Sequence, residues 1–172
     1  QMTELWDIYD GQARRTGRTM QRGIPADGDY MMCVHVYLYN SADKFLMQKR
    51  SYRKETHPGE WDITVGAVLS GEESVDGALR ETKEETGISI KSEDLYFAGR
   101  FKKKNKFVDI FFVKSDFDIE DCTLQKEEVE EVKFVSADDM IDIEKNLRKR
   151  EEEYMSIIYR AIKHLGIALC NA

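Results

Sequence analysis

Residues 66–88 read GAVLSGEESVDGALRETKEETGI, a stretch that places Glu81, Glu84 and Glu85 within about one turn of a predicted helix. Like charges three or four residues apart destabilise a helix by about 0.2–0.5 kcal/mol per pair. A helix that gathers such charges either exposes them to water or uses the concentrated negative charge for binding. In the first case the glutamates form an ordinary solvated surface, and in the second they form a binding site.

The apolar spacing of this stretch predicts an amphipathic helix over Ser74–Thr86, and Gly87 stands where a helix typically ends. One side of that helix is expected to form a narrow stripe that faces the core, made of Val75, Ala78, Leu79 and Thr82. The three glutamates share a different wedge of about 100°. Arg80 lies one turn before Glu84 and is placed to pair with it.

Three carboxylates on one wedge, with the backbone carbonyl of Gly66 nearby, would form a site made only of oxygen ligands. A glycine lets its carbonyl approach a ligand closely. Hard divalent cations such as Mg²⁺ and Mn²⁺ prefer oxygen ligands, and a bound cation would relieve the repulsion among the glutamates. The alternative is a solvated acidic face without a ligand.

The whole stretch resembles the Nudix box, the signature of the Nudix hydrolase family, written G-x5-E-x7-R-E-U-x-E-E-x-G-U with U apolar. The matching positions are Gly66, Glu72, Arg80, Glu81, Glu84, Glu85, Gly87 and Ile88. With each residue type used at roughly 7%, chance agreement at the seven fixed positions is on the order of one in 10⁸. Thr82 departs from the pattern at an apolar position, where its methyl group can pack against the core.

The resemblance implies a Nudix α/β/α sandwich with a mixed central sheet and a reaction in which water attacks a phosphorus of a nucleoside diphosphate linked to another group. It implies that Mg²⁺ or Mn²⁺ is held by the Gly66 carbonyl and by Glu81, Glu84 and Glu85. The expected partner is therefore a small-molecule diphosphate substrate.

The candidate catalytic residues are Glu84, Glu128 and Arg80, of which Arg80 would mostly brace the loop and the helix together with Glu72. Glu128 matches a late-loop glutamate of the family, although its acidic neighbours leave open that it is only a charged loop residue. Arg50 matches a basic position that can face the diphosphate, and Lys49 beside it is a second candidate substrate-binding residue.

A weaker resemblance over most of the chain points to the Nudix branch that contains isopentenyl-diphosphate isomerases. Those enzymes need a cysteine where this chain has Gly66 and histidines where it has Val68 and Met31. A glycine cannot transfer protons, a valine cannot bind a metal, and the glutamate-rich box is intact, so we expect hydrolysis rather than isomerisation. Cys33 lies well before the cysteine position in the sequence and is not expected to replace it. A non-catalytic module that senses a nucleotide is the third possibility.

The remaining pattern predicts one α+β domain over residues 1–172, with an N-terminal hairpin in 1–30 around Asp10-Gly11 and C-terminal helices in 136–166. Strands are expected at 31–40 and 44–51, paired as a hairpin, at 61–69, broken by Gly66, at 95–103 and 105–116, paired as a second hairpin, and at 130–136. His35 is expected to pack inside its strand. The lysines of 102–106 are expected to form a solvated turn, with phosphate attraction as the alternative.

Composition favours a globular protein without affinity for polyanions. The 172 residues are 41% hydrophobic and 34% charged, and the net charge of −7 argues against nucleic-acid or anionic-membrane partners. Cys33, Cys122 and Cys170 show no metal-like spacing and suggest reduced thiols. With no long apolar run and no signal peptide, we expect a cytoplasmic protein that is a monomer or a homodimer.

Overall fold

The computed structural model describes residues 4–170, so the outermost residues of the predicted 1–172 domain, 1–3 and 171–172, lie outside the described part. The strands are β1 (Leu5–Tyr9), β2 (Arg15–Gln21), β3 (Met31–Tyr39), β4 (Lys44–Arg50), β5 (Trp61–Asp62), β6 (Thr64–Ala67), β7 (Leu95–Lys103), β8 (Lys106–Lys114) and β9 (Val129–Ser136). The helices are α1 (Ser74–Thr86), α2 (Ala137–Asp142) and α3 (Glu152–Leu165), with the short turns η1 (Ser92–Asp94), η2 (Ile119–Asp121) and η3 (Ile143–Leu147).

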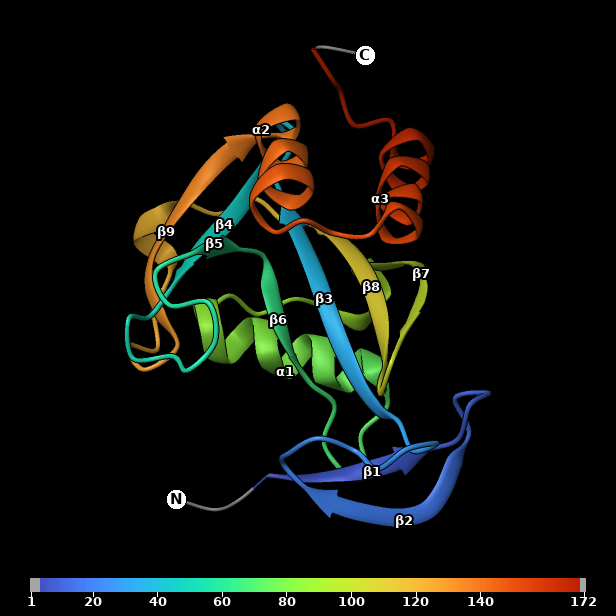
Figure 1. Ribbon diagram of the computed structural model, residues 1–172. Helices are drawn as coiled ribbons and strands as arrows, with labels where there is room; N and C mark the ends of the chain where they lie inside the picture. Colours follow the sequence, from blue (N-terminus) through green and yellow to red (C-terminus); the bar gives the residue numbers. More distant parts are fainter. Residues whose placement is uncertain (1–3, 171–172) are drawn as a thin grey trace.

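Seven strands form one mixed sheet in the order β5-β4-β3-β8-β7, with β6 also paired to β3 and β9 paired to β4. β3 and β8 run parallel along their whole length, from Met31 beside Lys106 to Tyr39 beside Lys114, and the other pairs are antiparallel. β1 and β2 form a separate two-stranded sheet below the main one (Figure 1). The mixed central sheet of the predicted α+β fold is therefore confirmed.

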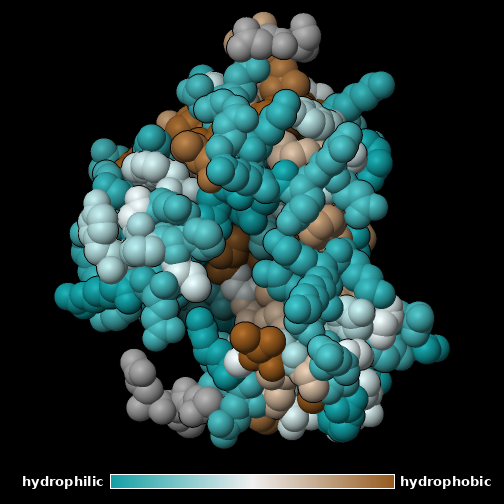
Figure 2. Space-filling model, viewed as in Figure 1, coloured by the Kyte–Doolittle hydropathy of each residue, from teal (hydrophilic) through white to brown (hydrophobic). Residues whose placement is uncertain are grey.

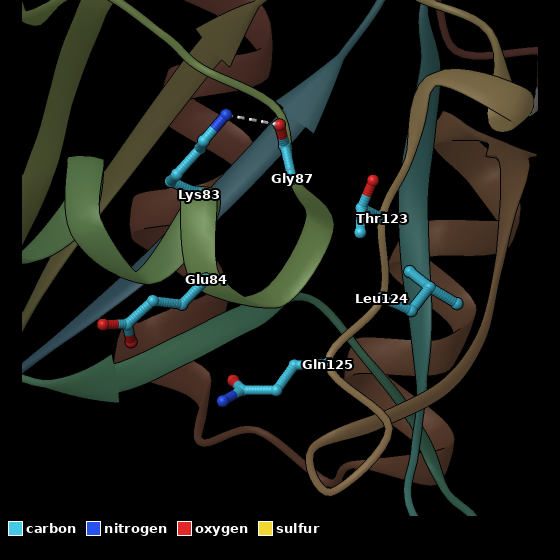
Figure 3. Close-up of a pocket in the computed structure, with 6 residues that line it drawn as sticks. All are labelled: Lys83, Glu84, Gly87, Thr123, Leu124 and Gln125. Carbon is cyan, nitrogen blue, oxygen red and sulfur yellow. Dashed lines mark hydrogen bonds between the residues drawn. The ribbon is translucent and has the colours of Figure 1, made fainter.

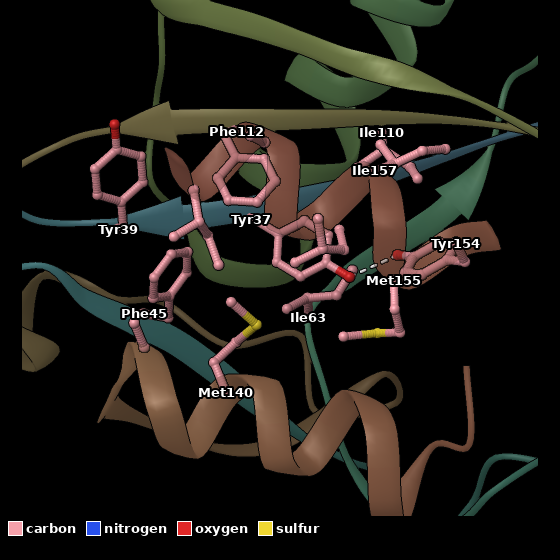
Figure 4. Close-up of a cluster of buried hydrophobic side chains, with 14 of the residues drawn as sticks. Tyr37, Tyr39, Phe45, Ile63, Ile110, Phe112, Met140, Tyr154, Met155 and Ile157 are labelled. Atoms are coloured by element: carbon pink, nitrogen blue, oxygen red, sulfur yellow. Dashed lines mark hydrogen bonds between the residues drawn. The ribbon is translucent and has the colours of Figure 1, made fainter. Parts of the chain in front are cut away.

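Alternate side chains of β3 enter two different cores, which shows that helices cover both faces of the sheet. Val34 and Val36 pack in the core that contains Ala78 of α1. Tyr37 packs in the other core, with Met140 of α2 and aromatic and aliphatic side chains from β4, β8 and α3 (Figure 4). The sandwich thus has α1 on one side and α2 with α3 on the other.

The predicted hairpin of β3 and β4 exists only at its closed end, where Tyr39 pairs with Phe45. Farther along, the two strands diverge, and β5 and β6 fill the gap by pairing Gln48 with Asp62 and Val34 with Gly66. The predicted strand over 61–69 is interrupted between β5 and β6 rather than at Gly66, which lies inside β6. The predicted hairpin is therefore confirmed, and it is short because β6 pairs with the same edge of β3 beyond the closed end.

Helix α1 has the predicted bounds, and Gly87 ends it in the left-handed region with φ of 78°. Ala78 and Thr82 are buried as expected, but Leu79 is only partly buried, and Glu85 and Thr86 are buried instead. The threonine hydroxyls donate to carbonyls one turn back, from Thr82 to Ala78 and from Thr86 to Thr82. The predicted stripe therefore faces the core through Val75, Ala78 and Thr82, without Leu79, and the polar Glu85 and Thr86 extend the buried side.

The predicted hairpins β1–β2 and β7–β8 are both confirmed. The β1–β2 turn is held by Asp10, whose Oδ1 accepts from the backbone N–H groups of Gln12 and Arg14. β7 and β8 pair over the basic turn at 103–106. Ser136 caps α2 through a bond from the Asp139 N–H, and Gly166 ends α3 in the left-handed region.

Between α2 and α3 the chain forms the π-helical turn η3 and a short irregular segment, residues 148–151, which the sequence did not reveal. This segment places two arginines, Arg148 and Arg150, beside the central sheet. Within residues 4–170, no helix is long and apolar enough to cross a membrane.

Candidate functional site

A cleft of about 680 Å³ opens where β3 and β6 lie side by side. The space-filling view shows this hollow near the middle of one face, bordered mostly by hydrophilic side chains (Figure 2). Its lining comes from α1, β3, β6, the 50–62 loop, the 125–128 loop, the β7–β8 turn, residues 148–150 and the N-terminal hairpin. Segments far apart in the sequence therefore meet around one polar space.

Arg80 braces the loop before α1 against the helix. Its guanidinium donates twice to Glu72, at 2.8 and 3.0 Å, and once to the carbonyl of Ala67, at 2.9 Å. The remaining nitrogen, Nη1, donates to Glu81 at 2.9 Å and to Glu84 at 3.1 Å. One arginine thus fixes the loop and at the same time holds two of the predicted metal ligands.

Gly66 gives Glu81 the space that it occupies. A Cβ built on Gly66 would lie 2.1 Å from the Glu81 Cδ, so no side chain fits there without displacing the carboxylate. Burial raises the pKa of Glu81 to about 7, against the opposing effect of Arg80 and with smaller contributions from Glu84 and Glu4. The Glu81 carboxylate, whose charged form is destabilised by burial, therefore lies directly against the backbone of β6.

Glu85 and Glu84, adjacent in sequence, have different environments. Glu85 is buried and accepts one bond of 3.4 Å from Gln48, while its Oε2 has no hydrogen-bond partner in the described chain. Burial, with smaller contributions from Glu81 and Glu128, raises the pKa of Glu85 well above its ordinary value. The Glu84 side chain is 47% exposed and lines the cleft.

As the side chains lie within residues 4–170, no three acidic, histidine or cysteine groups converge closely enough to hold a metal. Arg80 keeps Glu81 and Glu84 turned to itself, and Gln48 holds Glu85. The donor set nevertheless fits a hard divalent cation, because it consists only of oxygens and includes a buried carboxylate oxygen without a partner.

Glu128 and Arg50 both line the cleft. Glu128 forms an ion pair with Lys54 at 2.5 Å, and Arg50 donates to the carbonyl and the hydroxyl of Thr56 at 3.1 and 3.2 Å. Lys49 is not among the residues that line the cleft, and it lies near Glu131 at 3.6 Å. The structure therefore brings Arg50 and Glu128 to the candidate site and leaves Lys49 away from it.

A second, shallower pocket of about 400 Å³ lies at the C-terminal end of α1 (Figure 3). Lys83 closes one side by donating to the carbonyl of Gly87 at 3.1 Å, and Thr123 and Leu124 form the other side. Glu84 and Gln125 line both this pocket and the cleft, so the two spaces meet at these side chains.

Sequence reasoning missed much of the cationic lining of the cleft, which includes Lys54, Lys103, Lys106, Arg148 and Arg150. Two lysines of the β7–β8 turn, Lys103 and Lys106, border the cleft, as the alternative of phosphate attraction requires, and Lys103 is also exposed to solvent. No motif marks the arginines of 148–150, because their position depends on the turn η3. The basic turn was the one signal that could have indicated part of this lining.

Cys33 also corrects an expectation. It lies across from Ala67 in the β3–β6 pair and lines the cleft, although it is far from residue 66 in the sequence. Burial raises the pKa of its thiol to about 11, with Lys106 acting in the opposite direction. Distance along the chain was therefore a poor argument against a role for Cys33.

The model of the NUDIX domain matches residues 29–157 of this chain, which include α1, the cleft floor and Arg148 and Arg150. The chain belongs to the Nudix hydrolase family. It is 35% identical over 139 residues to an uncharacterized Nudix hydrolase of Listeria monocytogenes, covering 80% of this chain and 82% of the relative. It is 34% identical over 148 residues to Nudix hydrolase 3 of Arabidopsis thaliana, covering 77% of this chain and 19% of that protein.

Several solved structures share the fold of this chain. A Deinococcus radiodurans protein, DR0079, aligns with a TM-score of 0.66 at 21% identity and covers 80% of this chain and 86% of its own. The NUDIX domain of Shewanella oneidensis NrtR, solved with ADP ribose, aligns with a TM-score of 0.58 at 16% identity over 79% of this chain and 88% of its own. An Ap4A hydrolase of C. elegans aligns with a TM-score of 0.56 at 23% identity over 79% of this chain and 98% of its own.

Proposed function

We propose that this Nudix hydrolase cleaves the diphosphate of a nucleoside diphosphate linked to another group, in a reaction that depends on Mg²⁺ or Mn²⁺. The metal ligands in this proposal are the Gly66 carbonyl and the carboxylates of Glu81, Glu84 and Glu85. The observation that carries it is the buried carboxylate pair of Glu81 and Glu85, one packed against a position with no room for a Cβ and the other with an unpartnered oxygen.

Bound divalent metal would neutralise phosphate charge and help to generate hydroxide from water. The chain's own residues would then do three things. Arg80 would keep Glu72 and the Ala67 carbonyl while it releases Glu81 and Glu84 to the ligand, so that the loop stays fixed. Arg50 and Lys106 would hold phosphate oxygens, and Glu84 or Glu128 would take the proton from the attacking water.

The substrate class is supported by the chemistry of the cleft and by two structural neighbours. The cleft combines carboxylates for a metal with several cationic side chains for phosphate oxygens. Among proteins of the same fold, one was solved with ADP ribose and another is an Ap4A hydrolase, both of which concern nucleotides that contain a diphosphate linkage. A cytoplasmic location and a monomer or homodimer stay predictions.

A second candidate is isomerisation of isopentenyl diphosphate, favoured by the place of Cys33 in the cleft. Moving a double bond needs one group that protonates a carbon and another that deprotonates the next. Burial raises the pKa of the Cys33 thiol to about 11, which makes it a poor proton donor at neutral pH. Hydrolysis is therefore the better-supported reaction.

The test is a panel of nucleoside diphosphates, sugar nucleotides, dinucleoside polyphosphates and isopentenyl diphosphate, each with Mg²⁺, with Mn²⁺ and with excess chelator. We expect release of a monophosphate from at least one nucleotide, lost in chelator, and no dimethylallyl diphosphate. Full hydrolysis in chelator would contradict the metal dependence. Nucleotide binding without turnover would favour a sensing module, and dimethylallyl diphosphate without any hydrolysis would favour the isomerase.

A further inference from the structure

A buried hydrogen-bond chain leads from the interior of the protein to the floor of the cleft. The hydroxyl of Tyr37 lies 2.6 Å from the hydroxyl of Tyr154 (Figure 4), which in turn lies 2.7 Å from Nδ1 of His35. Tyr37 is 0% and Tyr154 is 2% exposed, and His35 lines the cleft. The sequence had indicated only that His35 would be packed inside its strand.

The direction of the protons in this chain follows from counting donors and acceptors. If Tyr37 donates to Tyr154 and Tyr154 donates to Nδ1 of His35, every buried proton of the chain has an acceptor. In either other arrangement of the two contacts, Nδ1–H donates to Tyr154, and one tyrosine hydroxyl then has no acceptor among residues 4–170. A buried donor without an acceptor loses its hydrogen bond to water without replacement, so the first arrangement is favoured.

In that arrangement the proton of the imidazole is on Nε2, the nitrogen that is left for the cleft. Nε2 has no hydrogen-bond partner among the described residues, and it is not among the fully buried polar atoms, so it is in contact with solvent. Burial lowers the pKa of His35 well below its ordinary value, and the charges of Arg150 and Lys106 act in the same direction. Both effects keep the ring neutral.

The surroundings fix this ring in place. The guanidinium of Arg150 lies over the Tyr154 ring at 5.1 Å and is itself held by Glu144 at 2.6 Å and by Asp62 at 2.9 Å. The ring of Tyr154 also meets His35 edge-on, with centroids 5.5 Å apart. The donor at Nε2 is therefore rigid and needs little reorganisation to meet a ligand.

We propose that His35 is a substrate-positioning residue whose neutral Nε2–H donates a hydrogen bond to an oxygen of the bound diphosphate, and that the Tyr37–Tyr154 pair holds it in this tautomer. The inference rests on the proposed function of the same cleft. A bond made equally in the ground state and the transition state changes KM more than kcat.

The kinetic test compares His35→Leu, which has no donor, with His35→Gln, whose amide retains an N–H near the same place. We expect His35→Leu to raise KM by about ten- to hundredfold, since a hydrogen bond to a charged group contributes about 1.5–3 kcal/mol, and to leave kcat within about threefold. His35→Gln should recover much of the loss. His164→Gln on the outer side of α3, where His164 stacks on Tyr96, is the matched control and should change nothing.

The second measurement does not depend on turnover. In ¹⁵N NMR of the whole protein, the missing resonances of His35→Gln assign His35, and we expect a neutral ring with the proton on Nε2. Adding inorganic pyrophosphate or ADP with Mg²⁺ should shift that nitrogen, and Tyr154→Phe should mix the two tautomers. Tyr154→Phe keeps the ring under Arg150, so a loss of the tautomer there would point to the hydroxyl.

The outcomes separate the two proposals. Hydrolysis of a nucleotide with an unchanged KM in His35→Leu, or a proton found on Nδ1, would overturn the role of His35 and leave the proposed function standing. If no diphosphate is cleaved or bound, the proposed function fails, and this inference fails with it.

Discussion

Arg80 and Arg150 both bind carboxylates at the cleft. The two sets of partners differ in their distance along the sequence from the arginine and in how deeply they are buried. Arg80 on α1 binds Glu72, Glu81 and Glu84, none more than eight residues away. Arg150 binds Glu144 and also Asp62, which is 88 residues away. The partners of Arg80 can be predicted from a short sequence motif, whereas the contact of Arg150 with Asp62 depends on the folded structure.

The two arginines also differ in what their partners can do. The Glu144 and Asp62 side chains are 0% and 2% exposed, so the ion pairs of Arg150 are closed to bulk solvent, although Asp62 and Arg150 border the cleft. Glu81 and Glu84 line the cleft, so a cation from solvent can compete with Arg80 for them. Burial raises the pKa of both Glu81 and Glu144 to about 7 against the pull of the arginines. Similar ion pairs therefore differ in burial, since the carboxylates that Arg150 holds are almost fully buried and Glu84 is 47% exposed.

The largest expected effect is on stability and comes from the closed pairs. Arg150→Met would leave Glu144 with an uncompensated buried charge, and breaking such a pair costs about 3–5 kcal/mol. We expect a loss of this size in the free energy of unfolding measured in urea. Arg18→Met is the control, because Arg18 forms a similar two-bond pair with Asp29 but is exposed, and it should change stability far less.

The double variant Arg150→Met/Glu144→Leu sharpens this result. Removing both charges replaces the Arg150–Glu144 pair by apolar groups, which is often neutral or stabilising, and Asp62 keeps its ion pair with Arg148 at 3.0 Å. Recovery of most of the lost stability would identify the unpaired carboxylate as the cause. If Arg150→Met alone were as stable as the wild type, the ion pairs of Arg150 would not contribute to stability as we expect.

The next effect is on activity and comes from the open pairs. Glu84→Gln and Glu85→Gln should each lower kcat by about 10²–10³-fold, the cost typical of one lost electrostatic contact in a transition state. The melting temperature of Glu85→Gln should stay the same or rise, because the buried Oε2 has no partner to lose. Turnover with saturating Mg²⁺ and thermal melts measure the two quantities.

Glu93→Gln in the exposed turn η1 removes the same charge at a distance from the cleft and should leave kcat unchanged. If the two α1 variants turned over substrate as fast as this control, the glutamates would be no more than an acidic face. The carboxylates held by Arg80 would then have no role in catalysis.

The sequence predicted α1 and its glutamates well because a helix joins residues that are close along the chain. The bounds of α1 and the end at Gly87 followed from local spacing. The partial exposure of Leu79 did not follow from local spacing. The side of the helix that is buried depends on how α1 packs against the sheet, and that packing buries Glu85 and Thr86. The short extent of the β3–β4 hairpin did not follow either, since the distant strand β6 pairs with the edge of β3 that faces β4.

The site shows the same division. Glu81, Glu84, Glu128 and Arg50 were candidates from the sequence, and all four line the cleft. Lys103, Lys106 and Arg150 reach it through a hairpin turn and a π-helical turn, whose placement depends on tertiary packing. In the hydrogen-bond chain from Tyr37 to His35, Tyr154 lies 117 residues from Tyr37 and 119 residues from His35 along the sequence. No local sequence pattern encodes such contacts.

The smallest expected effect separates two neighbouring basic residues. Arg50 lines the cleft, whereas Lys49, next to it on the same strand, lies near Glu131 and away from the cleft. Adjacent side chains on a strand point to opposite faces. We expect Arg50→Met to raise KM for the nucleotide substrate by about tenfold, or about 1.4 kcal/mol, and Lys49→Met to leave it within about twofold.

Arg50 also donates to Thr56, so a change at Arg50 can act through the loop rather than through the substrate. Thr56→Val separates the two effects, because it removes the hydroxyl that accepts from Arg50 and keeps the charge in the cleft. If Arg50 binds phosphate, Thr56→Val should change KM far less than Arg50→Met does. Equal increases in the two variants would mean that Arg50 only holds the loop, and an increase in Lys49→Met alone would place the substrate on the opposite face of β4.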